Sequence, residues 1–203
     1  MATVVLDDAL AKRLRDERAA SGGDRYDEVW EETYMMAPMP NNEHQEVVNG
    51  LAAVLQIVIA WPNLGSVFPG VNVSDRVDDW EQNYRVPDLA VFLNETLAVD
   101  HGSFWHGGPD FAVEVVSPGD QTRSKLDFYA RVGTRELLVI DRAPWQLELY
   151  KLASGSLELV LGQGTSAISD LLGLTFDLKS PAGKEQRPSL EVSQSATKKI
   201  WTI

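Results

Sequence analysis

The sequence has 203 residues, 44% hydrophobic and 24% charged, which is typical of a globular domain. It contains no cysteine, which excludes disulfides, zinc–thiolate sites and thiol nucleophiles and favours a cytoplasmic location. It has 18 Lys and Arg and 30 Asp and Glu, which gives a net charge of −12. This charge argues against phosphate backbones as partners, because clustered Lys and Arg usually bind them. The most apolar stretch, residues 51–61, is too short to cross a bilayer, so no membrane partner is expected.

The first 60 residues predict a polar helix, a β segment and an amphipathic helix. The polar helix covers residues 6–20 and ends at Ser21-Gly22-Gly23. The β segment covers residues 28–37, where Pro38 breaks it. The helix over residues 42–60 is the clearest element, because its apolar residues form one broad stripe: Val47, Val48, Leu51, Val54, Leu55, Val58 and Ile59.

The middle of the chain predicts buried strands. Residues 86–93 and 111–116 are nearly continuous apolar runs, as in the central strands of a covered sheet. Each run holds one carboxylate, Asp88 in the first and Glu114 in the second. Around them we expect a strand over 66–74, an acidic loop over 75–81 and a loop over 94–110.

The second half predicts one more helix and several strands. The helix covers residues 121–132, with Asp120 or Thr122 as its N-cap and Gly133 at its C-terminal end. Residues 136–141 predict a buried strand and residues 145–152 a strand with one wet face. Residues 157–161 extend this meander and residues 171–178 close the domain.

The order of these elements predicts a mixed α/β (α+β) architecture around one sheet. We expect an N-terminal helical extension over residues 1–24, a domain over 25–178 and a C-terminal tail over 179–203.

Asp88 and Glu114 are the residues that call for an explanation. A charged carboxylate in a buried strand is costly unless a cation, a metal or hydrogen-bond donors compensate it. If two strands of one sheet bring the two acids together, they form an oxygen-rich site that suits Mg²⁺. The alternatives are a turn or capping acid at Asp88 and a structural ion pair at Glu114. Carboxylates on opposite faces of the sheet would exclude an enzyme.

Lys125 is the candidate cation for this pair. An enzyme of this design needs a lysine at the position of Val116, and it is absent there. Lys125, in the first turns of the next helix, can point back towards the strand ends, with Tyr129 one turn later on the same face. Such a lysine can orient a water or stabilise charge on a phosphate. The alternative is a solvated helix lysine.

These residues resemble a known family. The segments YRVPDLAVF and FAVEVVSPGDQTRSKLDFYARVGTRELLVID, with YDEVWEETYMMAPMPNNEHQEVVNGLAAVL before them and SDLLGLTFDL after them, are similar to the Uma-type restriction-endonuclease-like proteins. The resemblance covers residues 26–178. It implies the PD-(D/E)XK nuclease fold, in which helices flank a central mixed β-sheet.

The resemblance also implies an activity and a set of site residues. Asp88 and Glu114 are then the metal-binding acids and Lys125 the displaced catalytic lysine. Glu28 is a further metal ligand or water-binding group, or else an exposed strand acid, and His44 opens the long helix as a site residue or as a cap. The implied function is an endonuclease that hydrolyses DNA phosphodiester bonds with Mg²⁺ or Mn²⁺. The alternative is a non-catalytic nuclease fold used for nucleic-acid binding or protein assembly.

Two departures from the family are visible. The connection from Glu114 to the next helix is shorter than in most members, and Glu32 stands where a glycine is common. Because nucleases of this fold often cut two strands as pairs, the resemblance also implies a homodimer.

Charge is distributed unevenly along the chain. Residues 114–151 carry six basic residues and six acids, so the whole acidic surplus lies elsewhere. We therefore expect weak DNA binding that depends on metal and salt. Four arginines in this segment are candidate phosphate contacts or solvated side chains: Arg123, Arg131, Arg135 and Arg142. We expect His101 and His106 to be ordinary loop residues and not ligands of a transition metal, because their spacing matches no metal-binding motif.

Overall fold

A six-stranded mixed sheet forms the centre of the protein in the computed structural model, which describes residues 3–117, 121–181, 183 and 187–203, the side chains of 161–163 excepted. Strands β10 and β11 pair in parallel, and the other neighbours within this sheet are antiparallel. In spatial order the strands are β13 (Ser156–Gly164), β12 (Trp145–Ala153), β11 (Glu136–Arg142), β10 (Phe111–Val115), β7 (Leu89–Leu93) and β4 (Gly65–Phe68).

The central strands confirm the predicted buried runs. Every residue of β10 is buried, and so are the first four of β7 and the first five of β11. The strand predicted over 145–152 forms, but the face predicted to be solvent-exposed is partly buried. Glu148 and Tyr150 are buried there, because Arg123 covers Glu148 with two hydrogen bonds (3.1 and 2.8 Å) and Tyr150 donates to the same carboxylate (2.7 Å).

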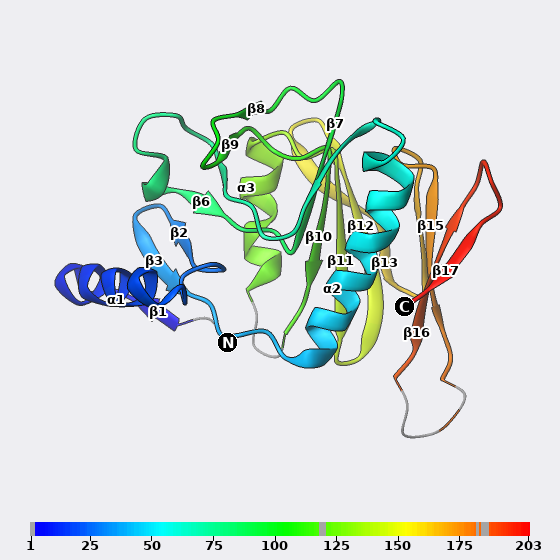
Figure 1. Cartoon of the computed structure of the whole chain (residues 1–203), viewed down its shortest axis with the longest axis horizontal. Helices are drawn as coiled ribbons and strands as arrows, with labels where there is room; N and C mark the ends of the chain where they lie inside the picture. The colour runs from blue at the N-terminus through cyan, green and yellow to red at the C-terminus, as the bar shows by residue number, and fades with distance from the viewer. Residues whose placement is uncertain (1–2, 118–120, 182, 184–186) are drawn as a thin grey trace.

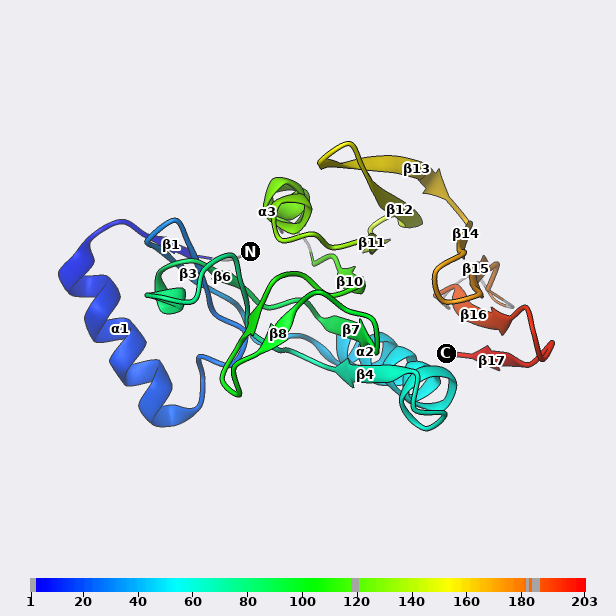
Figure 2. The same ribbon diagram turned by 90° about the horizontal axis from the view of Figure 1, so that it is seen from above.

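Helices cover both faces of the central sheet (Figures 1 and 2). On one face lie α2 (Asn42–Leu55) and the π-helical turn η1 (Gln56–Ala60), which together match the helix predicted over 42–60. The apolar stripe of α2 packs against the side chains of Val113 and Val115. On the other face lie the 3₁₀ turn η3 (Thr122–Lys125) and α3 (Leu126–Arg131), with Ala112 among their core partners.

The helix predicted over 121–132 is therefore two short segments. Thr122 is the first residue of the 3₁₀ turn and not its cap, because Gln121 holds that position, and Asp120 lies outside the described residues. Gly133 has a φ of 86° just after α3, as its position at the end of the helix predicts.

The segment predicted as a β run over 28–37 is a hairpin. Strands β2 (Glu28–Trp30) and β3 (Thr33–Met36) are joined by Glu31 and Glu32, whose φ angles of 45° and 70° define a two-residue turn with both residues left-handed. Glu32 thus occupies a backbone conformation that favours glycine.

The hairpin belongs to a seven-stranded sheet of short strands. Its order is β1-β3-β2-β6-β5-β9-β8. The strand expected over 66–74 divides between the two sheets, and the loop expected over 94–110 contains two short strands. The remaining elements are β1 (Thr3–Val5), β5 (Val73–Ser74), the 3₁₀ turn η2 (Trp80–Gln82), β6 (Tyr84–Arg85), β8 (Val99–Asp100) and β9 (Trp105–His106).

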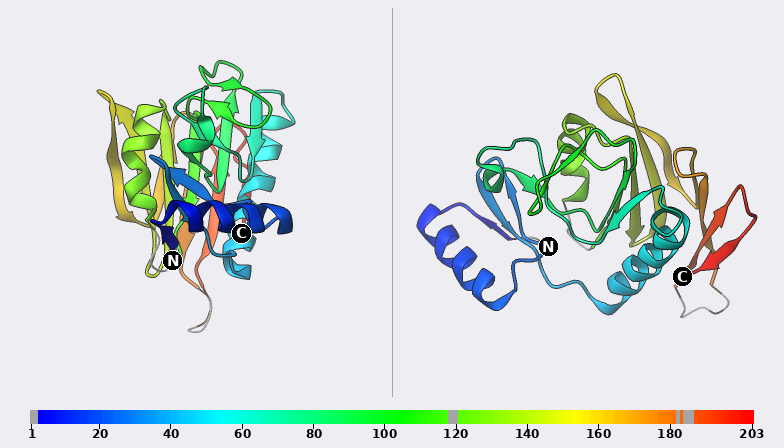
Figure 3. Two further views of the ribbon diagram at one scale, coloured as in Figure 1. Left: turned by 90° about the vertical axis from the view of Figure 1, so that its left-hand side faces the viewer. Right: turned by 45° about the horizontal axis from the view of Figure 1, so that its top comes forward.

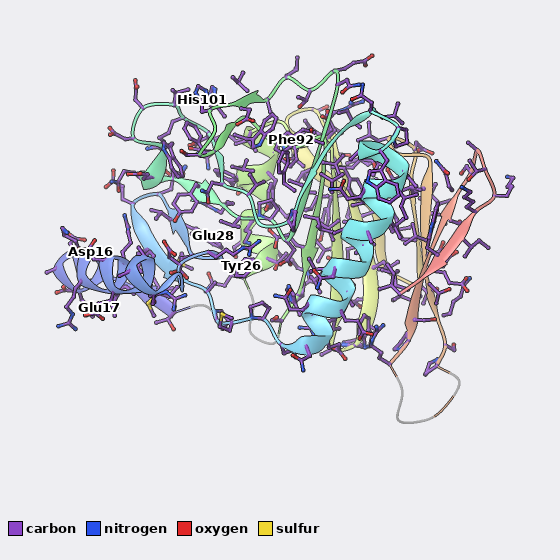
Figure 4. The ribbon with its side chains drawn as sticks, in the orientation of Figure 1. Asp16, Glu17, Tyr26, Glu28, Phe92 and His101 are labelled. Atoms are coloured by element: carbon purple, nitrogen blue, oxygen red, sulfur yellow. The ribbon has the colours of Figure 1, made fainter. Side chains whose placement is uncertain are left out.

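The N-terminal helix α1 (Asp8–Ser21) confirms the predicted polar helix and its glycine stop. Asp7 caps it by accepting a hydrogen bond from the Leu10 N–H (2.7 Å), and Gly22 is left-handed. None of its residues is buried, and Asp16 and Glu17 project away from the body (Figure 4).

The C-terminal segment corrects the expectation of a tail. Strands β14 (Ser166–Ser169), β15 (Leu174–Lys179), β16 (Ser189–Gln194) and β17 (Ile200–Thr202) form a third, antiparallel sheet at the end of the molecule opposite α1 (Figure 3). Leu190 and Val192 of β16 are in the main core, and Ile203 packs so closely on α2 that a Cβ at Gly50 would lie 2.5 Å from its Cγ2. The polar composition hid the alternation of buried and exposed residues in β16.

Candidate active site

The register of β7 and β10 places Asp88 opposite Glu114. The antiparallel pairs Phe111–Val91, Ala112–Ala90 and Val113–Leu89 continue by one step to these two acids. Cross-strand partners project from the same face of a sheet. The Val115 N–H also donates to Asp88 Oδ2 at 2.7 Å, which ties the start of β7 to the end of β10. Both acids line the same cavity.

Lys125 reaches the same face from η3. Its Nζ donates to Glu114 Oε1 at 2.9 Å and to Glu28 Oε1 at 2.8 Å. The side chain is only 10% exposed, so this is a buried ion pair and not a solvated helix lysine. Val116, where a nuclease of this design carries its lysine, packs instead into the apolar cluster under α3.

Tyr129 lies one turn after Lys125 and is fully buried. Its hydroxyl donates to Glu114 Oε1 at 2.6 Å. Burial, together with the adjacent Glu114, raises the pKa of Tyr129 well above 10, so the phenol keeps its proton and remains a donor. Lys125 and Tyr129 thus fix the same oxygen of Glu114.

Glu28 at the start of β2 is fully engaged by the protein. Its Oε1 accepts from the Val86 N–H (2.8 Å) and from Lys125, and its Oε2 accepts from Trp30 Nε1 (2.6 Å). The Arg85 guanidinium lies over the Trp30 ring, 4.6 Å from its centre, in a cation–π contact. These bonds make Glu28 an anchor for Lys125.

His44 holds Asp88 from the other side of the site. It lies in the first turn of α2, where Asn41 caps the helix by accepting the His44 N–H at 2.9 Å. Its Nε2 is 2.9 Å from Asp88 Oδ1, while Nδ1 is buried with no hydrogen-bond partner among the described residues. His44 therefore orients Asp88 as well as opening the helix.

Glu114 has the most perturbed carboxyl group of the site. Burial raises its pKa to about 8; Asp88 and Glu28 add to the rise, and Lys125 opposes it. Its second oxygen, Oε2, accepts no hydrogen bond from the described residues, and Glu114 lines a cavity of about 110 Å³. The site thus leaves one carboxylate oxygen open towards this cavity.

Glu114 offers the open oxygen of the donor set for a divalent cation. Hard cations prefer carboxylate oxygens, whereas both oxygens of Asp88 and of Glu28 already accept hydrogen bonds. Within the described ranges no three or more His, Asp or Glu residues are grouped as a ready-made metal site, and this includes His101 and His106. His101 instead stacks on Phe104, with 4.8 Å between ring centres.

The four candidate phosphate-binding arginines are all paired with carboxylates. Arg123 contacts Asp141 and Glu148, and Arg131 contacts Glu31 and Asp75. Arg135 contacts Asp110, and Arg142 contacts Glu43 at 2.8 Å. Arg142 also donates to the Val116 carbonyl and to the Asn41 side chain, so it ties the end of β10 to the start of α2.

Sequence reasoning missed the apolar wall of the cavity. Tyr26 precedes Glu28 at the hairpin (Figure 4), and the wall continues through the segment after β3. The sequence signal is the run Met35-Met36-Ala37-Pro38-Met39-Pro40, whose apolar character continues beyond the predicted end of the β segment at residue 37. The wall residues that line the cavity are Tyr26, Trp30, Met35, Ala37, Pro38, Met39 and Pro40.

The mixed sheet with helices on both faces, and two acids meeting at neighbouring strand ends beside a lysine, define a restriction-endonuclease-like protein. The sequence model of the Uma2 family, described as "Putative restriction endonuclease", matches residues 13–179. The chain therefore belongs to the Uma2 family, as its motifs indicate.

One solved structure shows the same fold. It is a protein from Anabaena variabilis described as a "putative nuclease" of a domain family of unknown function. The two are 18% identical, with a TM-score of 0.56, over 71% of this chain and 80% of the other. Among curated proteins none matches the sequence. Over the described residues, no helix is both long and apolar enough to cross a membrane.

Proposed function

We propose that the protein is a divalent-metal-dependent endonuclease that hydrolyses phosphodiester bonds in DNA. The observation that carries the proposal is that Asp88, Glu114 and Lys125 line one cavity, with Lys125 in contact with Glu114. Membership of a nuclease-like family supports it.

In this proposal Asp88 and Glu114 bind the cation, Mg²⁺ or Mn²⁺, through the carboxylate oxygens that face the cavity. When bound, the cation activates a water and offsets charge on the leaving oxygen. Lys125 holds the attacking water or the scissile phosphate, and Glu28 fixes its ammonium. His44 and Tyr129 keep the two acids in orientation.

The alternative is a non-catalytic protein with a nuclease fold that serves in nucleic-acid binding or protein assembly. Its support is that Lys125 already neutralises Glu114 and Glu28, and that both Asp88 oxygens already accept hydrogen bonds. The same contacts could then serve stability alone.

Cleavage of plasmid and single-stranded DNA with Mg²⁺ or Mn²⁺ separates the two. We expect Lys125→Ala and Glu114→Gln to lose at least about 100-fold in rate. The matched control, Glu95→Gln in an exposed turn, keeps full activity. Equal cleavage by all four proteins would reveal a contaminant and refute the proposal, and so would no cleavage by any of them.

If both strands of a duplex are cut, two chains acting as a pair supply the two sites. This homodimer is part of the proposal, and sedimentation of the protein with and without duplex DNA tests it.

A further inference from the structure

The apolar wall of the cavity includes the segment Pro38, Met39 and Pro40. Met39 is 82% exposed at its edge, although a large apolar side chain gains nothing from contact with water. Pro38 and Pro40 on either side of it carry no N–H, so this stretch offers few hydrogen-bond donors to a ligand. The cavity is therefore lined by both charged and apolar side chains.

The apolar wall is held in place before any ligand arrives. The buried Asp27 accepts a hydrogen bond from the Ala37 N–H at 2.8 Å. Arg18 of α1 donates to the Ala37 carbonyl at 3.1 Å and to Asp27 Oδ1 at 2.7 Å. Both backbone groups of Ala37 are thus fixed, which sets the start of the Pro38–Pro40 segment.

Cations to receive a long phosphate backbone are scarce at this site. Lys125 is the single Lys or Arg among the described residues that line the cavity, and it already contacts two carboxylates. The nearby Arg142 is paired with Glu43 and is 5% exposed. The whole chain carries a net charge of −12. Duplex DNA binds non-specifically through several Lys and Arg contacts, which the described residues that line this cavity do not supply.

We infer that the substrate of the proposed nuclease is single-stranded nucleic acid, bound with an unpaired base against the Pro38–Met39–Pro40 wall. This inference rests on the proposed function. In a duplex the base faces are stacked and out of reach, whereas an unpaired base offers an apolar face to Met39 beside the scissile phosphate. Base contact then supplies affinity that the missing phosphate contacts do not.

The first test compares three substrates of equal length in Mg²⁺: a single-stranded oligothymidine 12-mer, its duplex with oligoadenosine, and a 12-mer in which every nucleotide is an abasic tetrahydrofuran unit. The abasic strand keeps the phosphates and lacks the bases. We expect cleavage of the single strand at least about tenfold faster than cleavage of either other substrate, which is the scale of one base contact.

The second test removes the wall side chain. Met39→Ala should slow cleavage of the oligothymidine about fivefold to tenfold and leave the abasic strand unchanged. Leu97→Ala is the matched control, because Leu97 is 97% exposed in a different part of the chain. Equal urea midpoints for the two variants and wild type exclude a folding effect.

The outcomes separate the two levels of the argument. Absence of Glu114-dependent cleavage of any of the three substrates overturns the proposed function. Glu114-dependent cleavage in which the duplex is cut as fast as the single strand, or in which Met39→Ala slows both strands equally, overturns the substrate inference alone.

Discussion

Replacing Glu114 by Gln should stabilise the fold and abolish the proposed activity. The folded protein raises the pKa of Glu114 from 4.5 to about 8, with burial as the main cause. An acid whose folded pKa is raised contributes stability that is complete below the unfolded pKa and is lost as the pH rises through the folded pKa. The stability of the wild type should therefore fall between pH 4.5 and pH 8 on account of this group.

The size of the effect follows from the same rise. Each tenfold change in an ionisation constant corresponds to about 1.4 kcal/mol, so a rise from 4.5 to about 8 corresponds to about 5 kcal/mol once Glu114 is fully ionised. Water entering the cavity beside the ionised group reduces this penalty, and we expect a gain of about 2–4 kcal/mol for Glu114→Gln at pH 8. The Tyr129 hydroxyl can still donate to the amide oxygen of the glutamine.

Urea unfolding at pH 5 and pH 8, with a chelator present, measures this gain. At pH 5 the variant and wild type should differ by less than about 1 kcal/mol, because Glu114 is still protonated in the folded state. Glu95→Gln should leave stability unchanged at both pH values. A difference between Glu114→Gln and wild type that stays constant from pH 5 to pH 8 would refute the argument.

Three further changes test other parts of the structure, each by urea unfolding. Lys125→Ala leaves Glu28 and Glu114 buried without their cation and should lower the free energy of unfolding by about 3–5 kcal/mol at pH 8. The control Lys12→Ala changes an exposed lysine and should lower it by less than about 0.5 kcal/mol. Equal effects would mean that the Lys125 ion pairs are not buried in solution. Glu32→Gly relieves a left-handed φ of 70° in the β2–β3 turn and should stabilise by about 0.5–1 kcal/mol, and a loss of stability would show a different turn. Leu190→Ala removes a fully buried side chain of β16 and should lower the free energy of unfolding by about 2–5 kcal/mol. An unchanged free energy of unfolding would mean that residues 189–203 are a tail and do not pack on the core.

The sequence predicted the central sheet well because its signals are local. Buried strands such as β10 are short apolar runs, and the apolar stripe of α2 can be counted residue by residue. The C-terminal strands were missed because β16 is half exposed and alternates too weakly to stand out from its polar neighbours. The left-handed turn at Glu31 and Glu32 was hidden for a different reason, since neither residue favours that conformation.

The meeting of Asp88, Glu114 and Lys125 could be expected from the motif, but their surroundings could not. His44 and Asp88 are 44 positions apart, and Lys125 and Glu28 are 97 apart. Such contacts depend on how α2 and the hairpin pack against the central sheet, which no local pattern records. The apolar wall was missed for the same reason, because only the fold places Met39 at the same cavity as the acids.

The acidic surplus of the chain and the ion pairs around the site have a common consequence. Arg123, Arg131 and Arg142 each have a carboxylate partner, so these basic residues of the central segment are engaged within the protein. Glu114 then remains a buried acid whose charge Lys125 offsets only in part. In the proposed nuclease, a cation and a phosphate that bind together would complete this balance, whereas a phosphate alone would meet Asp88 and Glu114 with one shared ammonium. Binding of substrate and metal should therefore be mutually dependent, with each tightening the other by the same factor.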